Sequence, residues 1–178
     1  MLFAAGLVVA GCGSSGGTGS PSTSTTTTAT ATDVPRGFDP CTGIPASVLE
    51  AEKLKPTGRD DADSPNGVMW RGCAWVVRGG DSYSVSIRTT NLTVPMVRAR
   101  NFTDTREFTI AGRQAISTHQ FEGPYVMAVC AVNVEMRDGS LEVNLNNPPS
   151  RKETGNLDSC QLARALAEKV MPSVPAGA

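Results

Sequence analysis

Residues 125–145 read YVMAVCAVNVEMRDGSLEVNL, and this stretch decides the fold. Residues 125–137 form the longest strand pattern in the chain, with an apolar residue at every second position from 126 to 136, which predicts a long strand with one buried face. Asp138-Gly139 is the dipeptide that most strongly predicts a tight hairpin turn, and the alternation resumes in a return strand at 141–145. The side chains that we expect on one face of the first strand are Val126, Ala128, Cys130, Val132, Val134 and Met136. The stretch therefore predicts an antiparallel hairpin.

Segments before the hairpin also have strand patterns. Residues 68–78 are apolar on both faces, which predicts a central strand rather than an edge strand. Residues 83–87 alternate apolar side chains with serines, as in a strand with one solvated face. Residues 108–110 and 114–118 predict a further strand pair. Together with the hairpin, these segments predict an antiparallel sheet of five or six strands.

Helical patterns stand at both ends of this strand-rich region. Residues 45–54 begin with proline and carry apolar side chains on one side, which predicts a first helix. Residues 158–171 have apolar residues at a spacing of four and end before a proline, which predicts a last helix. Residues 94–102 suggest a short helix, and the acidic residues 59–67 suggest a loop. We therefore expect an α+β domain whose N- and C-terminal helices cover one face of the sheet.

Four cysteines lie within this region: Cys41, Cys73, Cys130 and Cys160. An even number of cysteines in an exported domain predicts two disulfides. A zinc site would need closely spaced pairs, and the cysteines stand 32, 57 and 30 residues apart, with the single histidine, His119, near none of them in sequence. We therefore predict no metal and no cofactor.

Three disulfide pairings are possible for these cysteines. Cys41–Cys73 with Cys130–Cys160 is the pairing that we favour, because it ties each terminal helix to a strand beneath it. The pairing of Cys41 with Cys160 remains open and would join the two helices instead. In the chain-entropy account, a bridge that closes a loop of about 30 residues stabilises the fold by about 3–4 kcal/mol.

The first residues predict export and lipid attachment. Residues 1–11 are a short apolar run that suits a signal peptide and is too short to span a membrane. Val9-Ala10-Gly11-Cys12 resembles the bacterial lipobox, in which Cys12 would carry acyl chains such as palmitate. The basic residues that normally precede such a run are missing, so we expect a misassigned or trimmed start. The predicted location is the outer face of the cell membrane, with the lipid on Cys12 as the anchor.

The composition divides the chain into a stalk and a domain. Residues 13–32 consist only of Gly, Ser, Thr, Pro and Ala, including eight threonines and five serines. Such a segment cannot bury enough apolar area to fold, so we expect a disordered stalk over 12–37, either glycosylated or plain. Residues 38–175 form the single predicted domain. The formal net charge of −1 provides no basic field for nucleic acid.

Chemical groups that could support catalysis are sparse. His119 stands in a polar strand end with no nucleophile motif near it, so we expect an exposed or hydrogen-bonded strand residue rather than a general base. Asp60, Asp61 and Asp63 form a loop cluster that we expect to be solvated, with weak calcium binding as the alternative. We therefore predict that the protein is not an enzyme and has no catalytic residues.

Four residues remain as weak ligand-binding candidates. Trp70 and Trp75 could stack on a sugar or a peptide, but they lie on opposite faces of one strand, so at least one should be packed in the core. Arg98 and Arg100 could meet phosphate or lipid headgroups, although a solvated helix face explains them better.

Several short motifs, in order, resemble one known family. They are Asp39-Pro40-Cys41 before a helix, Trp70-Arg71-Gly72-Cys73-Ala74-Trp75, Gly112-Arg113-Gln114-Ala115, Asp158-Ser159-Cys160 and Met171-Pro172, behind the lipobox and stalk. With these motifs the sequence resembles an actinobacterial lipoprotein family, catalogued as domain of unknown function 3558, that includes Lpr- and Lpp-type lipoproteins of mycobacteria. The resemblance covers about residues 38–175. It implies an exported, lipid-anchored domain and no particular reaction.

Two classes of function follow as expectations. The first is a non-catalytic binding module of the cell envelope that meets a protein, lipid or glycan partner. The second is an accessory or regulatory subunit of a membrane-associated system, and an enzyme comes a distant third. A large apolar cavity between sheet and helices would favour a lipid, whereas an exposed apolar patch would favour a protein partner.

Overall fold

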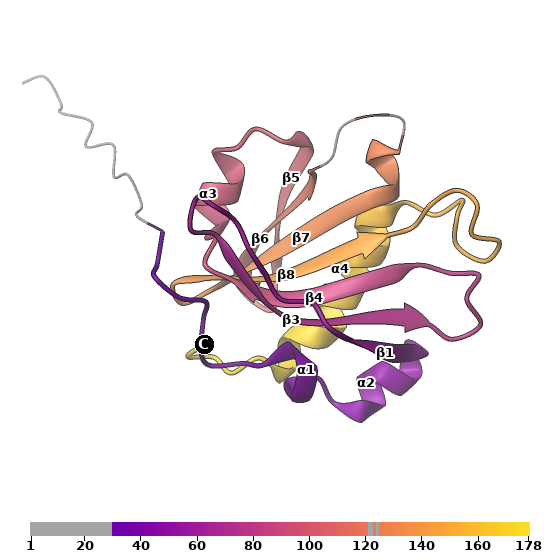
Figure 1. Cartoon of the computed structure of the whole chain (residues 1–178), viewed down its shortest axis with the longest axis horizontal. Coiled ribbons are helices and arrows are strands. Elements are labelled where there is room, and N and C mark those ends of the chain that lie inside the picture. The colour runs from indigo at the N-terminus through magenta and orange to yellow at the C-terminus, as the bar shows by residue number, and fades with distance from the viewer. Residues whose placement is uncertain (1–29, 121–122, 124) are drawn as a thin grey trace, which may run out of the picture.

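The computed structural model describes residues 30–120, 123 and 125–178 (Figure 1). The predicted signal peptide, Cys12 and the stalk up to residue 29 lie outside the described residues. Residues 30–37, which we assigned to the stalk, contact the domain. The side-chain amide of Asn91 donates to the carbonyl of Ala31 at 2.8 Å, and Pro35 is buried. The ordered domain therefore includes residues before position 38.

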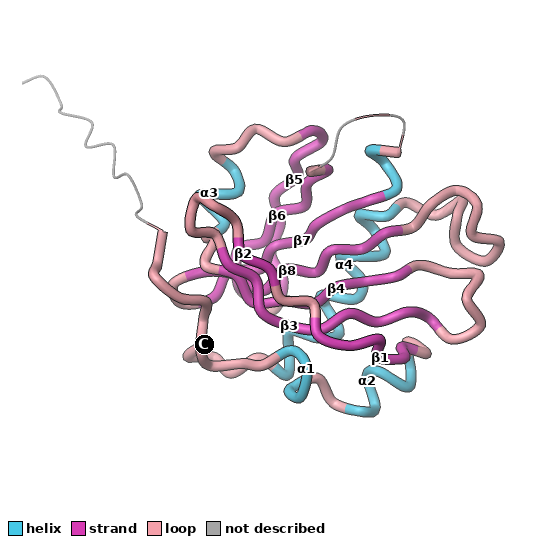
Figure 2. Tube along the Cα trace, viewed as in Figure 1, coloured by secondary structure: helices cyan, strands magenta, loops and turns pink. Residues whose placement is uncertain are grey.

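The domain is built on one antiparallel sheet of eight strands (Figure 2). The strands run in the order β1-β3-β4-β8-β7-β6-β5, and the short β2 also pairs with β3. The hairpin predicted around Asp138-Gly139 is present as β7 and β8 near the middle of this order. The bounds of the strands are β1 Leu54–Arg59, β2 Ala62–Asp63, β3 Met69–Val77, β4 Ser84–Thr90, β5 Thr103–Ile110, β6 Arg113–His119, β7 Val129–Met136 and β8 Gly139–Asn146.

The prediction of five or six strands was wrong, because two strands lie where we expected the end of a helix and a loop. The predicted helix over 45–54 ends at Ala51, and Lys53 turns the chain with a φ of 53°. β1 then forms one edge of the sheet, and all of its residues after Leu54 are exposed. An edge strand that is solvated on both faces has no apolar alternation to reveal it.

The first part of the hairpin also differs from its pattern. Residues 126–128 form a single 3₁₀ turn, η1, and β7 begins only at Val129. The partner strand β8 ends at Asn146, and Pro148 and Pro149 follow soon after it. Proline has no backbone N–H to continue a ladder. Val126 and Ala128 therefore lie in this turn and not in the strand, although Ala128 is buried as expected.

The helices lie on both faces of the sheet. α4 crosses β7 and β8 on one face, behind the sheet in Figure 1, and α1 contacts β3 and β4 over the same main core. α3 contacts β6 and β7 over a second, smaller core. The arrangement is therefore not a sheet covered only by terminal helices. The helices are α1 Pro40–Gly43, α2 Ala46–Ala51, α3 Val94–Arg98, η1 Val126–Ala128, α4 Ser159–Val170 and η2 Met171–Ser173.

Two disulfides join helices to strands across the main core. The structure pairs Cys41 of α1 with Cys73 of β3, and Cys130 of β7 with Cys160 of α4. This is the pairing in sequence order. None of the helices in the described residues has the length and apolar character to cross a bilayer.

Candidate functional site

An apolar patch is formed by Tyr125, Met127 and Leu157. These are the large hydrophobic residues that the described structure leaves exposed, with 70%, 53% and 47% of their surface accessible. All three line one surface depression of about 310 Å³, together with Pro149. Scattered exposed apolar residues are ordinary, but their concentration at one place indicates a contact surface. Sequence reasoning missed this patch, because Tyr125 and Met127 stand in a segment that matched a buried strand.

Hydrogen bonds hold the two segments of the patch in place. The loop between β8 and α4 folds around Asn147, whose side-chain amide donates to the carbonyls of Thr154 and Leu157 at 2.7 and 3.0 Å. Ser159, in the first turn of α4, donates from Oγ to the carbonyl of Met127 at 2.7 Å. The loop and η1 are therefore tied to each other, and the patch is preorganised.

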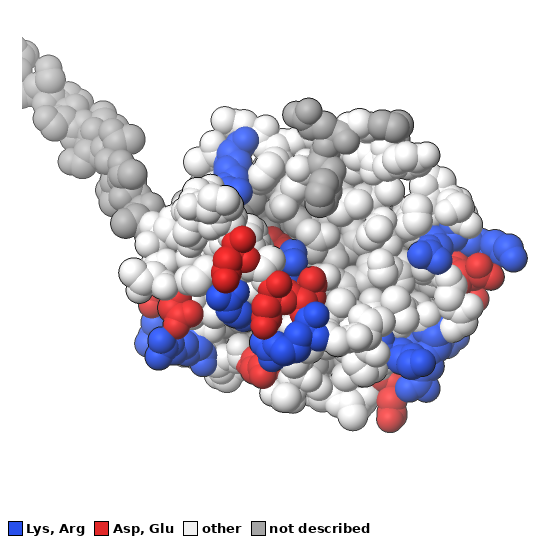
Figure 3. Space-filling view, in the orientation of Figure 1, with Lys and Arg blue, Asp and Glu red and all other residues white. Residues whose placement is uncertain are grey.

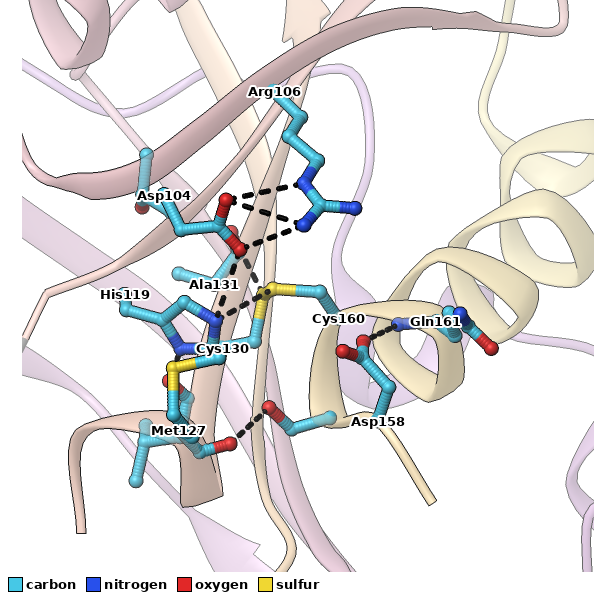
Figure 4. Close-up of a disulfide and its surroundings, with 12 residues drawn as sticks. Asp104, Arg106, His119, Met127, Cys130, Ala131, Asp158, Cys160 and Gln161 are labelled. Atoms are coloured by element: carbon cyan, nitrogen blue, oxygen red, sulfur yellow. Dashed lines mark hydrogen bonds and ion pairs between the residues drawn. A yellow bond between two sulfur atoms is a disulfide. The ribbon is translucent and has the colours of Figure 1, made fainter.

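The Cys130–Cys160 disulfide adjoins the apolar patch in the chain, since Cys160 follows Leu157 by three residues and Cys130 follows Met127 by three. Figure 4 shows His119 against this disulfide, with its Nε2 at 3.5 Å from the Sγ of Cys160. His119 is 2% exposed, and its Nδ1 lies 2.7 Å from the carbonyl oxygen of Val129. His119 is therefore a buried, hydrogen-bonded residue at the end of β6.

Asp104 approaches the same histidine from the edge strand β5. A bulge between Thr103 and Arg106 interrupts the pairing of β5 with β6, and Asp104 adopts a φ of 50° there. A bulge can redirect a side chain, and here the carboxylate of Asp104 lies 3.9 Å from His119 Nε2 and 3.0 Å from Arg106. No sequence signal connects these residues, because strand pairing alone brings them together.

The site contains three potential metal ligands. One ligand atom from each of His119, Cys130 and Cys160 lies within 4.8 Å of the others. His119, which is remote from the cysteines in sequence, therefore lies beside two of them in the folded domain. Both sulfurs are joined in a disulfide, however, and metals bind cysteine as the thiolate. In this oxidation state the cluster does not offer a zinc ligand set.

The acidic cluster is neutralised by arginines. Asp60 pairs with Arg88 at 3.2 Å, Asp61 with Arg59 at 2.9 Å, and Asp63 with Arg71 at 2.6 Å. Figure 3 shows acidic and basic side chains side by side on this face. The hydrogen bond from Arg59 is the main cause that lowers the pKa of Asp61 below its usual value. Carboxylates that are already paired in this way are poor calcium ligands.

The two tryptophans have structural contacts. Trp75 is 2% exposed and lies in the main core. Trp70 packs against the smaller core, and its Nε1 donates to Glu142 at 3.2 Å while the Arg88 guanidinium stands 5.7 Å from its ring centroid. Neither ring is free to stack on a ligand.

The two arginine candidates lie at the end of α3. Arg98 is held by Glu107 through two hydrogen bonds, of 2.5 and 2.7 Å, while Arg100 is exposed beyond the helix. The structure does not bring either arginine or either tryptophan to the apolar patch or to the disulfide.

The fold and the site define the class of protein: a disulfide-linked, antiparallel-sheet domain with a helix on each face and a small exposed apolar patch. The chain belongs to the family described as "Protein of unknown function (DUF3558)", whose model matches residues 7–173. This match confirms the domain of unknown function 3558 that the sequence motifs indicated. No curated protein matches the chain, and no solved structure matches it.

Proposed function

We propose that this domain is a non-catalytic binding module that meets a protein partner through the apolar patch. The observation that carries the proposal is the convergence of Tyr125, Met127 and Leu157 on one depression. The partner segment that fits is a short peptide stretch carrying an apolar anchor side chain. Export and attachment through Cys12 are part of the proposal, supported by the lipobox-like Val9-Ala10-Gly11-Cys12 and by the two disulfides.

A protein partner is favoured over a lipid because side chains fill the core between the sheet and the helices. Large side chains fill the main core between the sheet and its helices, among them Trp75, Ile87 and Leu166, each of which is nearly inaccessible. A depression of about 310 Å³ at the surface suits one or two side chains, whereas lipid carriers need an enclosed apolar cavity.

A glycan partner is disfavoured by the positions of the tryptophan rings. Sugar recognition commonly uses an exposed aromatic face, but Trp75 is in the core and Trp70 is engaged by Arg88 and Glu142. Tyr125 supplies the one largely exposed aromatic ring among the described residues, and its neighbours Met127 and Leu157 are aliphatic. Apolar anchors beside an exposed tyrosine are typical of protein contacts.

Because the loop is already held in place, a small contact area at the patch can still give appreciable affinity. Ordering a loop on binding costs free energy, and that cost falls where the loop is already held in place. Asn147 and Ser159 fix the two segments of the patch before any partner arrives.

Peptide display on the full chain tests this function. Peptides selected on the wild-type protein should be enriched in apolar residues, and their affinity should be measured by fluorescence anisotropy. The Tyr125→Ser/Leu157→Ser variant should weaken binding by about tenfold or more, because it removes two anchor side chains. Lys55→Ser is the matched control, since it shortens an exposed side chain on β1 and should leave affinity unchanged. Equal affinity of the selected peptides for all three proteins would contradict the proposal.

A further inference from the structure

The groups around His119 determine which of its two ring nitrogens carries a hydrogen. Nδ1 faces the carbonyl of Val129 at 2.7 Å, and a carbonyl can only accept, so Nδ1 carries a hydrogen. Nε2 faces the Sγ of Cys160 and the carboxylate of Asp104. A disulfide sulfur and an ionised carboxylate both lack a hydrogen. Nε2 therefore points at two groups that cannot donate to it, and it is placed to take up a proton.

The two sulfurs of the neighbouring disulfide differ in accessibility. Cys130 is completely buried in β7, whereas Cys160 is partly exposed and lines a surface depression of about 210 Å³. Exchange requires an incoming thiolate to reach one sulfur and expel the other. Of the two residues, Cys160 is the one on the solvent side, so an incoming thiol meets Cys160 and Cys130 is the leaving group.

The leaving sulfur needs a proton. A thiolate on Cys130 would be buried without solvent, which is costly unless it is neutralised. A ring nitrogen of His119 lies within 4.8 Å of that sulfur. The carbonyl of Ala131 lies 3.8 Å from the Sγ of Cys130 and can accept from the thiol once it forms. The neighbourhood therefore accommodates Cys130 in its reduced, protonated form.

We propose that Cys130–Cys160 is an exchangeable disulfide and that Cys160 is a site of covalent modification by a thiol. The incoming thiol gives its proton to Nε2 of His119 and attacks the Sγ of Cys160. The new sulfur–sulfur bond forms to Cys160, the Cys130–Cys160 bond breaks, and its electron pair leaves on Cys130. The imidazolium, facing Asp104, then protonates Cys130. The incoming thiol is consumed and the thiol of Cys130 is formed, so no other oxidant or reductant is needed.

This proposal is independent of peptide binding at the apolar patch. It assigns His119 a chemical role that the sequence did not suggest. The step modifies the protein itself and does not convert a substrate repeatedly, so it does not make the protein an enzyme. Attack of Cys130 on the mixed disulfide reverses the step and restores the Cys130–Cys160 bond. A second thiol that attacks the mixed disulfide at the incoming sulfur instead leaves both cysteines reduced and yields a disulfide between the two incoming thiols. The thiol source is either a small molecule or a protein cysteine, because both offer the same sulfur chemistry.

The second disulfide provides an internal control. Cys41–Cys73 has no histidine beside it in the described structure; Arg59 lies 3.7 Å from the Sγ of Cys41. The full chain is incubated with reduced glutathione or with an unstructured cysteine peptide, quenched and alkylated, and each cysteine is followed by peptide mass spectrometry. We expect the adduct on Cys160, and Cys130–Cys160 opening about tenfold or more faster than Cys41–Cys73.

His119→Gln should slow the opening of Cys130–Cys160 by about tenfold or more and leave Cys41–Cys73 unchanged. Arg59→Gln is the matched variant at the other bridge and should not affect the Cys130–Cys160 rate. If His119→Gln has a lowered melting temperature, Asp104→Asn provides a second test of the same site. This variant should change the pH profile of the exchange rate. The relative rates with glutathione and peptide identify the thiol source. An adduct on Cys130, equal opening of both bridges, or unchanged rates in both site variants would overturn the proposal.

Discussion

Glu142 is a charged residue inside the sheet, with 1% of its side chain exposed. Its Oε1 accepts from Arg88 at 2.6 Å, and its Oε2 accepts from Trp70 at 3.2 Å. Arg88 itself is largely buried and has Asp60 as a second partner. A buried pair of this kind contributes little net stability against an apolar alternative, but breaking it leaves one charge without its partner.

Glu142→Gln should therefore destabilise the domain. Glutamine keeps the shape and can still accept from Trp70, yet it removes the negative charge beside Arg88. We expect a loss of about 3 kcal/mol in the free energy of unfolding, because Asp60 still offsets part of the charge. Urea unfolding measures this loss. Glu107→Gln is the control, because it breaks an exposed pair with Arg98 and should leave the midpoint nearly unchanged.

Tyr83 predicts how stability changes at alkaline pH. Burial, and then the charge of Glu52, raise the pKa of Tyr83 from 10.0 to about 12. Between these two values the unfolded chain loses the phenol proton while the folded chain keeps it, so stability is full below pH 10 and falls above it. A difference of one pKa unit corresponds to about 1.4 kcal/mol, so the free energy of unfolding should fall by about 2–3 kcal/mol between pH 10 and 12.

Tyr83→Phe removes this titration and keeps the ring. Its free energy of unfolding should decline less than that of the wild type between pH 10 and 12, and the two proteins should run parallel between pH 7 and 9. Chemical unfolding at each pH provides the comparison. Parallel curves over the whole range would show that the phenol does not contribute.

Most residues of the candidate site could not be recognised from the sequence alone. The disulfides were predictable because an even number of cysteines, in a chain that we expect to be exported, predicts bridges, and the order of helices and strands favoured one pairing. His119 was not recognisable as a neighbour of Cys160, nor Asp104 as a neighbour of His119. The bulge between Thr103 and Arg106 and the register of β6 with β5 bring Asp104 to His119, and neither is encoded in local residue patterns.

At the level of elements, prediction succeeded where one face is buried. The alternation in β4, β7 and β8 and the Asp138-Gly139 turn gave those strands their correct type. α4 is present as predicted, and Asp158 caps it by accepting from the backbone of Gln161. These elements form the middle of the sheet and the main cover of its core.

The elements that were missed lie where packing is one-sided or absent. β1 and β2 are exposed edge segments, with only Leu54 buried among their residues. The turn η1 was mistaken for strand because its sequence continues the alternation of β7, and only the end of β8 shows that pairing has stopped there. The apolar patch arises from this same break, so a failure of pattern reasoning coincides with the proposed binding surface.

For the whole molecule, the predicted anchor gives a direct test. If Cys12 carries acyl chains, Cys12→Ala should move the protein from the detergent phase to the aqueous phase in phase-separation experiments, because two or more chains are needed for stable membrane attachment. The melting temperature of the domain should not change. A variant that partitions like the wild type would refute the assignment of the anchor.

The two ends of the β7–β8 hairpin lie at opposite ends of the domain, which we call its two poles. At its turn, Gly139 lies against Pro35, beside the place where residues 30–37 join the domain and where the C-terminus also lies (Figure 1). At the other pole, Asn147 donates its backbone N–H to Ala128, next to the apolar patch. Eight strand residues separate the poles, a span of about 25 Å. A molecule held from its N-terminal side therefore presents the proposed binding surface at the far end of the domain, where a partner can approach without meeting whatever holds the chain.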